Sequence, residues 1–106
     1  MNNNNYMRIN AAEARKKMQE NPNAVILDVR TTGEFVSGRI PGAILLPSDT
    51  VREMAKTVLP NKDALILVYC RSGIRSANAA YTLSSMGYTN VFDFGGILDW
   101  HYEIAR

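Results

Sequence analysis

The segment ALILVYCRSGIRSANAA, residues 64–80, decides the fold class. Its first part, residues 64–69, is a short continuous apolar run rich in branched side chains, which is typical of a parallel strand covered on both faces. From Ser76 to Met86 apolar residues recur at helical spacing, and Gly87 follows as a favourable residue just beyond a helix. Residues 70–75 are therefore predicted to form a strand-to-helix loop at the carboxyl edge of a sheet, where open α/β sheets usually bind ligands.

The rest of the chain shows the same alternation of strand and helix signals. Residues 24–29, AVILDV, form a second branched apolar run, and residues 91–94, VFDF, are a further strand candidate. Asn10 and Glu13 have the spacing of a capping box, which predicts a helix ending near Glu20. The other predicted elements are a short helix in 31–38, a turn with a small strand in 40–47, a helix over 48–59, a turn at Gly95–Gly96 and a last helix over 97–104. This order predicts one α/β domain with right-handed crossovers and no linker or internal repeat.

Length and composition limit the class of protein. The 106 residues suffice for one compact domain, and 46% hydrophobic and 21% charged residues are ordinary for a globular protein. A formal net charge of +2 does not indicate a nucleic-acid partner, and no apolar run approaches the roughly 20 residues that span a bilayer. Because the start, MNNNNYMR, lacks the apolar core of a secretory signal, we expect a cytoplasmic protein without a membrane partner. We expect residues 1–5 to form a disordered tail and residues 6–106 to form the single domain.

The predicted loop contains Cys70, the only cysteine of the chain. One cysteine excludes an internal disulfide, and one cysteine with one histidine cannot supply the usual ligands of a zinc site, so we expect no metal. Such a loop directs backbone amides toward its centre, and these amides, with Arg71 and Arg75, should lower the thiol pKa below its free value of about 8.5. Gly73 suits a tight ring of this kind because it has no Cβ atom. A lone cysteine at a strand end is often only a small buried hydrophobe, but the arginines and the glycine favour a nucleophile.

Three ordered motifs resemble those of the rhodanese-like sulfurtransferases. CRSGIRS, residues 70–76, is similar to the active-site loop of that family, which often has the pattern C-R-x-G-x-R-S. LDVRTTGEFVSGRIPGA, residues 27–43, resembles its amino-terminal signature, and VFDFGGILDW, residues 91–100, resembles its closing segment. The resemblance extends from about Met7 to Trp100. It implies a three-layer α/β fold with a central parallel sheet of about five strands and helices on both faces.

The resemblance also implies an activity, the transfer of sulfane sulfur, with Cys70 as the catalytic nucleophile. The Cys70 thiolate would take the outer sulfur of thiosulfate or of a persulfide donor, and a thiol or a thiol protein would accept it in a second step. No external cofactor is implied. The implied substrate-binding residues of the active-site loop are Arg71, Ser72, Gly73, Ile74, Arg75 and Ser76.

Four residues outside the loop, two acidic or basic strand residues, a further arginine and the single histidine, also have expected roles. Asp28 and Arg30 match its D-V-R and end a predicted strand, so we expect them to support the loop as a polar brace. Arg39 stands where the family usually has histidine, and a cation there would attract anionic donors. His101 is the only histidine of the chain, and we expect it to be a solvated side chain without a catalytic role.

Alternative functions remain open at this point. Cysteine-based phosphatases use the loop C-x5-R, whose arginine grips phosphate oxygens. Six places after Cys70 stands Ser76, and Arg75 comes one place earlier, so the shorter loop favours sulfur over phosphate. A binding module without turnover is the second alternative, although inactive members of the family commonly lack the cysteine that this chain keeps. A thioredoxin-like redox role would need a resolving cysteine, which the chain does not contain.

Overall fold

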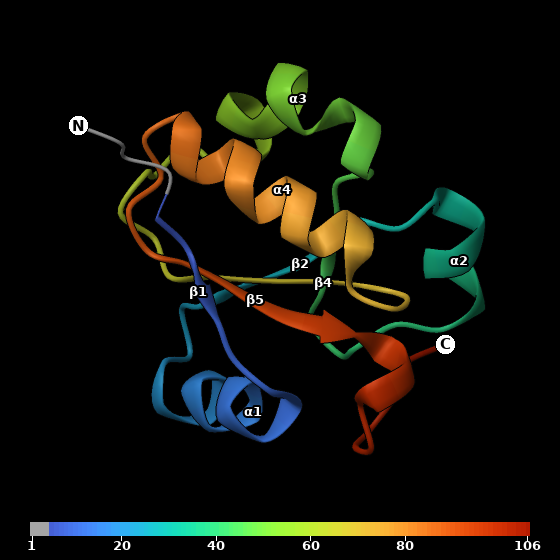
Figure 1. Cartoon of the computed structure of the whole chain (residues 1–106). Helices are drawn as coiled ribbons and strands as arrows, with labels where there is room; N and C mark the ends of the chain where they lie inside the picture. The colour runs from blue at the N-terminus through green and yellow to red at the C-terminus, as the bar shows by residue number, and fades with distance from the viewer. Residues whose placement is uncertain (1–4) are drawn as a thin grey trace.

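The computed structural model describes residues 5–106, which build a parallel sheet of five strands in the order β1-β5-β4-β2-β3 (Figure 1). Each pair of neighbouring strands is parallel. The strands are β1 (Met7–Arg8), β2 (Val25–Asp28), β3 (Ile44–Leu45), β4 (Ile66–Cys70) and β5 (Val91–Gly96). The predicted parallel α/β sheet is confirmed. Residues 1–4 of the predicted disordered tail lie outside the described residues.

Helices cover both faces of this sheet, as the sequence predicts. Helix α1 (Ala11–Glu20) lies on one face, and α3 (Val51–Val58) and α4 (Ile74–Ser85) lie on the other (Figure 1). The remaining elements are the short helix α2 (Thr32–Ser37) and two 3-10 turns, η1 (Ser48–Thr50) and η2 (Ile97–Asp99). Figure 1 shows α2 beyond the end of β4, close to the turn that leads into α4.

Local sequence explains where the first two helices begin. The Asn10 side chain accepts the Glu13 amide at 2.8 Å, and the Glu13 carboxylate accepts the Asn10 amide at 2.9 Å, so the predicted capping box is present. Thr31 and Glu34 form the same reciprocal pair at the start of α2. Glu34 is thereby fixed at the carboxyl edge of the sheet, where it also accepts hydrogen bonds from Arg75.

Strand β4 is the centre of the core. All of its residues are buried, and their side chains alternate between the two faces. Val68 and Cys70 pack with the cluster under α3 and α4, whereas Leu67 and Tyr69 pack with the cluster under α1. Both faces of β4 are covered by packed side chains, which explains its continuous apolar sequence as predicted.

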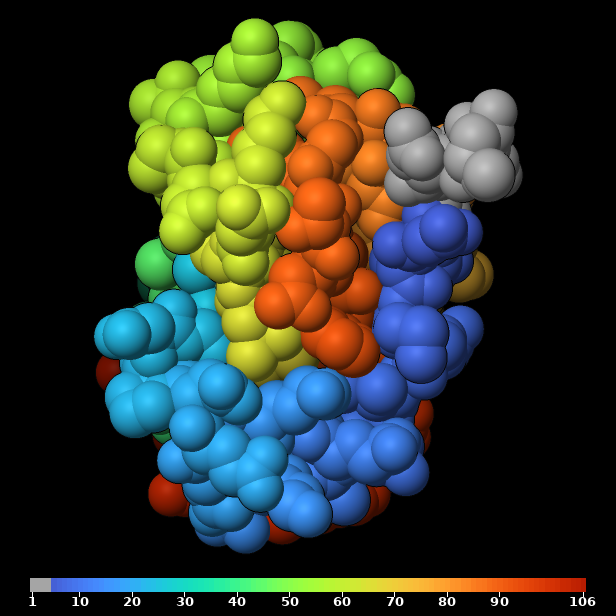
Figure 2. All heavy atoms as spheres, turned by 90° about the vertical axis from the view of Figure 1, so that its left-hand side faces the viewer, coloured from blue at the N-terminus to red at the C-terminus, as the bar shows by residue number. Residues whose placement is uncertain are grey.

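Connecting segments close the edge of the sheet at which the strands begin. Figure 2 views this end of the molecule and shows the segment after α3, in yellow, against the segment before β5, in orange. The Lys62 side chain donates to the Met86 carbonyl at 2.8 Å, and the Thr89 amide donates to the Lys62 carbonyl at 3.0 Å. The cysteine loop lies at the opposite, carboxyl edge of the sheet.

Two predicted boundaries are wrong, and glycines explain both. Helix α4 begins at Ile74 and not at Ser76, because Gly73 takes a φ of +114° and forms the helix cap. Strand β5 continues through the predicted turn at Gly95–Gly96. A Cβ atom at Gly96 would overlap the Arg71 carbonyl, so the strand can run past the loop only with glycine at this position.

The predicted helix over 97–104 is also wrong. Only η2 is helical there, and the Trp100 indole N–H then donates to the Glu103 carbonyl at 2.9 Å, which closes an irregular turn. Farther on, Arg39 and Ala105 form an antiparallel bridge. Strand β1 (Met7–Arg8), which pairs with β5, was not predicted. No helix in residues 5–106 combines the length and the apolar character needed to cross a membrane.

Candidate active site

Cys70 is the last residue of β4, and its sulfur lies beneath the amino end of the 12-residue helix α4. The side chain is almost fully buried, and the Gly73 amide donates to Sγ at 3.0 Å. Burial raises the pKa of the Cys70 thiol, but hydrogen bonds from the amides of Ser76, Gly73 and Ser72 oppose it, and the pKa lies below its ordinary value. The loop amides therefore lower the thiol pKa in the direction that the sequence predicts.

The loop is supported from below by the end of β5. A Cβ atom on Gly73 would lie 3.6 Å from the Gly95 Cα atom, in ordinary van der Waals contact. A Cβ atom on Gly96 would lie 2.6 Å from the Ser72 Cα atom, which real side chains do not allow. The double glycine of the closing segment thus permits contact between the backbones of β5 and the loop.

Asp93 is a buried member of the site that the sequence analysis did not identify. Its Oδ1 atom accepts the Ser76 hydroxyl at 2.7 Å and the Gly95 amide at 2.9 Å. Its Oδ2 atom has no hydrogen-bond partner within residues 5–106, and the Arg8 guanidinium approaches it to 3.8 Å. The signal that could have identified Asp93 is a charged residue within the apolar strand sequence VFDF. Asp93 connects β5 to the first turn of α4 through Ser76.

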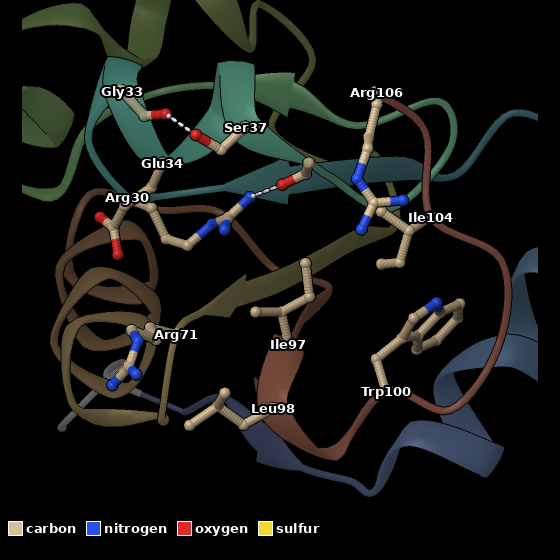
Figure 3. A pocket seen from close by; sticks show the side chains of 11 residues that line it. Arg30, Gly33, Glu34, Ser37, Arg71, Ile97, Leu98, Trp100, Ile104 and Arg106 are labelled. Carbon is tan, nitrogen blue, oxygen red and sulfur yellow. Dashed lines mark hydrogen bonds between the residues drawn. The ribbon is translucent and has the colours of Figure 1, made fainter.

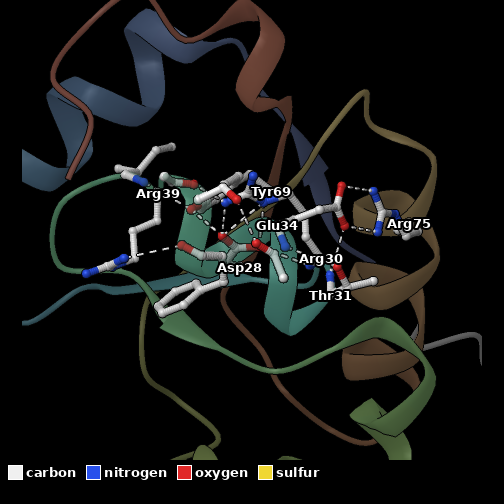
Figure 4. Close-up of polar contacts among 12 residues, drawn as sticks. Asp28, Arg30, Thr31, Glu34, Arg39, Tyr69 and Arg75 are labelled. Atoms are coloured by element: carbon white, nitrogen blue, oxygen red, sulfur yellow. Dashed lines mark hydrogen bonds and ion pairs between the residues drawn. The ribbon is translucent and has the colours of Figure 1, made fainter. Parts of the chain in front are cut away.

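The two loop arginines differ in their contacts. Arg75 makes a bidentate ion pair with Glu34 of α2, with distances of 2.7 and 3.0 Å (Figure 4). The hydrogen bonds from Arg75 lower the pKa of the Glu34 carboxyl to about 2, against the opposing effect of burial. Arg71 is exposed, and within residues 5–106 its side chain forms neither an ion pair nor a hydrogen bond. Only Arg71 of this pair has a guanidinium that is not already occupied by a carboxylate.

Asp28 and Arg30 form a buried network close to the loop (Figure 4). Arg30 donates to both carboxylate oxygens of Asp28, at distances from 2.7 to 3.1 Å, and to the Gly38 carbonyl at 2.7 Å. The Tyr69 hydroxyl donates to Asp28 at 2.6 Å and accepts the Ile40 amide at 3.1 Å. These contacts join β2 and β4 to the segment after α2, which is the geometry of a polar brace.

The other singled-out residues lie away from the sulfur. Arg39 donates to the Phe35 carbonyl at 3.2 Å, and its guanidinium lies over the Phe35 ring. His101 is exposed and lines a separate hollow with Arg8 and Asp99. Trp100 is buried against Phe94, with ring centroids 5.9 Å apart, as expected for packing residues. Within residues 5–106, no group of three or more His, Cys, Asp or Glu side chains could hold a metal ion.

A hollow of about 570 Å³ opens beside the loop, between α2 and the segment from η2 to Arg106 (Figure 3). We call it the α2–η2 hollow. Its lining includes Gly33 and Ser37 of α2, Arg71 of the loop, and Ile97, Leu98 and Trp100 beyond β5. Arg71, which follows Cys70 directly, lines the hollow, whereas Cys70 itself does not.

The parallel sheet and the thiolate loop between β4 and α4 are those of a rhodanese-like domain. The family model described as Rhodanese-like domain matches residues 10–103, and the chain belongs to this family. The resemblance inferred from the three motifs is thereby confirmed.

Named relatives include sulfurtransferases and one other activity. The chain is 38% identical over 73 residues to the thiosulfate sulfurtransferase PspE of Escherichia coli, covering 69% of this chain and 70% of that protein. It is 32% identical over 93 residues to a sulfurtransferase of Allochromatium vinosum, covering 87% and 85% respectively. It is also 36% identical over 94 residues to the tRNA uridine(34) hydroxylase of Photorhabdus laumondii, covering 84% of this chain but only 27% of that longer protein.

Solved structures agree with this assignment. A rhodanese-related protein from Thermoplasma volcanium matches with a TM-score of 0.82 at 34% identity, covering 94% of this chain and 98% of that one. A rhodanese from E. coli matches with a TM-score of 0.73, also at 34% identity, covering 78% of this chain and 98% of that one. The three-layer fold is therefore that of the family.

Proposed function

We propose that the protein is a sulfurtransferase that moves sulfane sulfur from thiosulfate or a persulfide donor to a thiol acceptor through a persulfide on Cys70. The observation that carries the proposal is the position of the Cys70 sulfur, which receives the Gly73 amide and has a thiol pKa held below its ordinary value. A stabilised thiolate at a helix amino end is the reactive form of cysteine.

The first step is an attack of the Cys70 thiolate on the outer sulfur of thiosulfate. A sulfur–sulfur bond forms to Sγ, the sulfur–sulfur bond of thiosulfate breaks, and sulfite leaves with the bonding electron pair. The three negative charges of the reactants are retained by the products, so no proton and no oxidant is needed. The amides of Ser72, Gly73 and Ser76 would stabilise the anionic persulfide as donors stabilise an oxyanion.

The arginines have separate roles in this proposal. Arg71, whose guanidinium has no carboxylate partner within residues 5–106, attracts the anionic donor. Arg75 supports the loop through Glu34, and Asp28 with Arg30 keeps the segment after α2 in place. We further propose that the reaction takes place in the cytoplasm and requires no cofactor, nucleic acid or membrane.

Phosphate hydrolysis receives less support from the geometry. A cysteine-based phosphatase needs an arginine whose planar fork is free to grip two phosphate oxygens. In this protein the fork of Arg75 is filled by the two carboxylate oxygens of Glu34. A phosphate group would have to displace that carboxylate, which opposes binding by charge and by geometry.

The hydroxylase relatives do not favour a second function. This chain corresponds to about a quarter of their length, 27% in the Photorhabdus protein, so the named reaction belongs to a much larger chain. The two sulfurtransferase relatives are covered over 70% and 85% of their length and give the proposal its support by similarity.

The decisive experiment is an intact mass measurement of the reduced protein after incubation with thiosulfate. We expect the wild type to gain one sulfur atom and the Cys70→Ser variant to gain none. Cyanide should then remove the added sulfur and release thiocyanate. If Cys70 alkylates rapidly at neutral pH but gains no sulfur from thiosulfate or from an organic persulfide, the proposal is wrong, and the phosphatase and binding alternatives come next.

A further inference from the structure

Asp93 is a fully buried carboxylate that the proposed reaction does not use. Its Oδ1 atom accepts the Ser76 hydroxyl at 2.7 Å and the Gly95 amide at 2.9 Å, whereas its Oδ2 atom accepts no hydrogen bond within residues 5–106. A buried carboxylate with one unpaired oxygen is costly unless a positive charge lies nearby. A cation beside Oδ2 is therefore expected.

Arg8 supplies this cation from the edge strand β1. Arg8 and Asp93 are directly paired residues of the parallel strands β1 and β5, so their side chains lie on the same face of the sheet. The Arg8 Nε atom lies 3.8 Å from Asp93 Oδ2, which makes an ion pair but is too long for a hydrogen bond. Arg8 shares a hollow with Glu13, Asp99 and His101, but in the described part of the chain Asp93 is its only ion-pair partner.

The same guanidinium reaches the loop that holds the sulfur. A Cβ atom on Gly73 would lie 3.5 Å from Arg8 Nη2, and a Cβ atom on Gly95 would lie 4.0 Å from it. The Gly73 amide donates to Cys70 Sγ at 3.0 Å. Arg8 therefore lies against both the buried carboxylate and the loop residue that contacts the sulfur.

Asp93 and Cys70 are neighbours through Ser76. The Ser76 hydroxyl donates to Asp93, and the Ser76 amide donates to the Cys70 sulfur. Asp93 pairs with Val68 of β4, and Val68 and Cys70 pack on the same face of the sheet, under α3 and α4. Because like charges disfavour each other's ionised forms, the Asp93 carboxylate opposes formation of an anion on the sulfur.

None of the other arginines near the loop forms an ion pair with Asp93 in residues 5–106. Arg71 is exposed and forms no ion pair there. Two more arginines are occupied by other carboxylates, in the pairs Arg75 with Glu34 and Arg30 with Asp28. Of these arginines, only Arg8 lies where its charge can offset that of Asp93.

The Arg8 side chain is not needed to hold β1 in the sheet. Strand β1 pairs with β5 through its backbone, and the Ile9 amide donates to the Asp93 carbonyl at 3.0 Å. The Arg8 side chain is 66% exposed, so its removal leaves no cavity in the core. What this side chain contributes to the site is its charge.

We propose that Arg8 is a positioning residue of the sulfur site, whose guanidinium offsets the charge of buried Asp93 so that a second anion, the thiolate or persulfide of Cys70, can form beside it. The inference rests on the proposed function in one respect, because the persulfide is the anion that matters for turnover. Loss of the Arg8 charge should make the thiolate harder to form, and loss of the Asp93 charge should have the opposite effect.

The test is the pH dependence of Cys70 alkylation by iodoacetamide, a neutral reagent whose own charge contributes nothing. Because Cys70 is the only cysteine, the midpoint of the rate profile is the pKa of this thiol. The ultraviolet absorbance of the thiolate, taken as the difference from Cys70→Ser, gives the same midpoint without a reagent. We expect Arg8→Gln to raise the midpoint by about one pH unit and Arg8→Lys, which keeps the charge, to leave it near the wild-type value.

Two companion variants identify the charge that Arg8 offsets. Asp93→Asn, added to Arg8→Gln, should lower the raised midpoint by about one pH unit and return the double variant to near the wild-type value. Lys56→Gln removes the same net charge from the exposed side of α3 and should titrate like the wild type.

The outcomes separate this inference from the proposed function. If Arg8→Gln moves the midpoint no more than Lys56→Gln does, the inference is refuted, and a loss of stability in urea without a shift would leave Arg8 only a structural role. A double variant that titrates like Arg8→Gln alone would also refute it, because Asp93 would then not be the opposing charge. No sulfur donor enters these measurements, so a failure of thiosulfate and persulfides to load Cys70 refutes the sulfurtransferase and leaves the titration result intact.

Discussion

The ion pair between Glu34 and Arg75 should stabilise the folded protein in a way that depends on pH. The Glu34 pKa falls from an ordinary 4.5 to about 2 on folding, with the hydrogen bonds from Arg75 as the largest cause. Such a shift corresponds to an upper limit of about 3 kcal/mol at neutral pH. The Arg75 side chain is 33% exposed and the Glu34 side chain is 27% exposed. Because solvent screening weakens a pair that is partly exposed, we expect a stabilisation of about 1–2 kcal/mol.

The perturbation is Glu34→Gln, which keeps the side-chain shape and an oxygen for the capping box with Thr31 but removes the charge. The folded-state pKa lies below the unfolded value, so the stabilisation is complete above about pH 5 and is lost as the pH falls toward 2. Urea denaturation should show the variant about 1–2 kcal/mol less stable than the wild type at pH 7 and nearly equal to it near pH 2.

The matched control is Glu20→Gln, which removes a carboxylate from the exposed pair with Lys16 on α1. That change should alter the free energy of unfolding by less than about 0.5 kcal/mol at either pH. If Glu34→Gln behaves like this control at pH 7, the pair contributes nothing to stability. A loss that stays constant down to pH 2 would show that the glutamine acts through packing and not through charge.

Three further changes test the loop and its support. Ser76→Ala removes the hydroxyl that donates to buried Asp93 at 2.7 Å and should lower the free energy of unfolding in urea by about 1–3 kcal/mol, because the carboxylate oxygen loses this partner. Gly96→Ala forces a Cβ atom into the loop backbone and should destabilise the protein by about 1–3 kcal/mol or more in urea, whereas Gly33→Ala, with nothing within 4 Å, should not. Tyr69→Phe leaves a buried carboxylate oxygen and a buried amide without this partner and should lower the free energy of unfolding by about 1–3 kcal/mol.

The order of elements was predictable because each has a local signal. The apolar runs of β2 and β4 and the capping box of α1 depend on neighbouring residues only, and the structure has them where the sequence predicts. Apart from the start of α4 and the missed strand β1, the errors concern residues 95–104, where the structure depends on contacts with distant parts of the chain. Gly96 extends β5 because it touches Arg71, and the segment beyond η2 is held by Arg39, neither of which a local pattern reveals.

The position of the candidate loop was predictable, but several of its side-chain contacts were not. The motif is enough to single out Cys70, and the loop that it predicts at the carboxyl edge is present. Asp93 was missed because a lone acidic residue in a strand has no distinctive spacing. The ion pair of Arg75 with Glu34 was also missed, because sequence proximity to Cys70 does not show which carboxylate an arginine meets.

The direction of the side chains in the first turn of α4, and not only the length of the loop, distinguishes this protein from the cysteine-based phosphatases. Successive residues of an α-helix are rotated by about 100°, so neighbouring side chains in the first turn of α4 point to different parts of the molecule. Ser76, the sixth residue after Cys70, points inward and donates to buried Asp93. Arg75, one residue earlier, points to α2 and meets Glu34. An arginine at position 76 would therefore meet the buried Asp93 carboxylate, so exchange of Ser76 alone would not place a free guanidinium beside the sulfur.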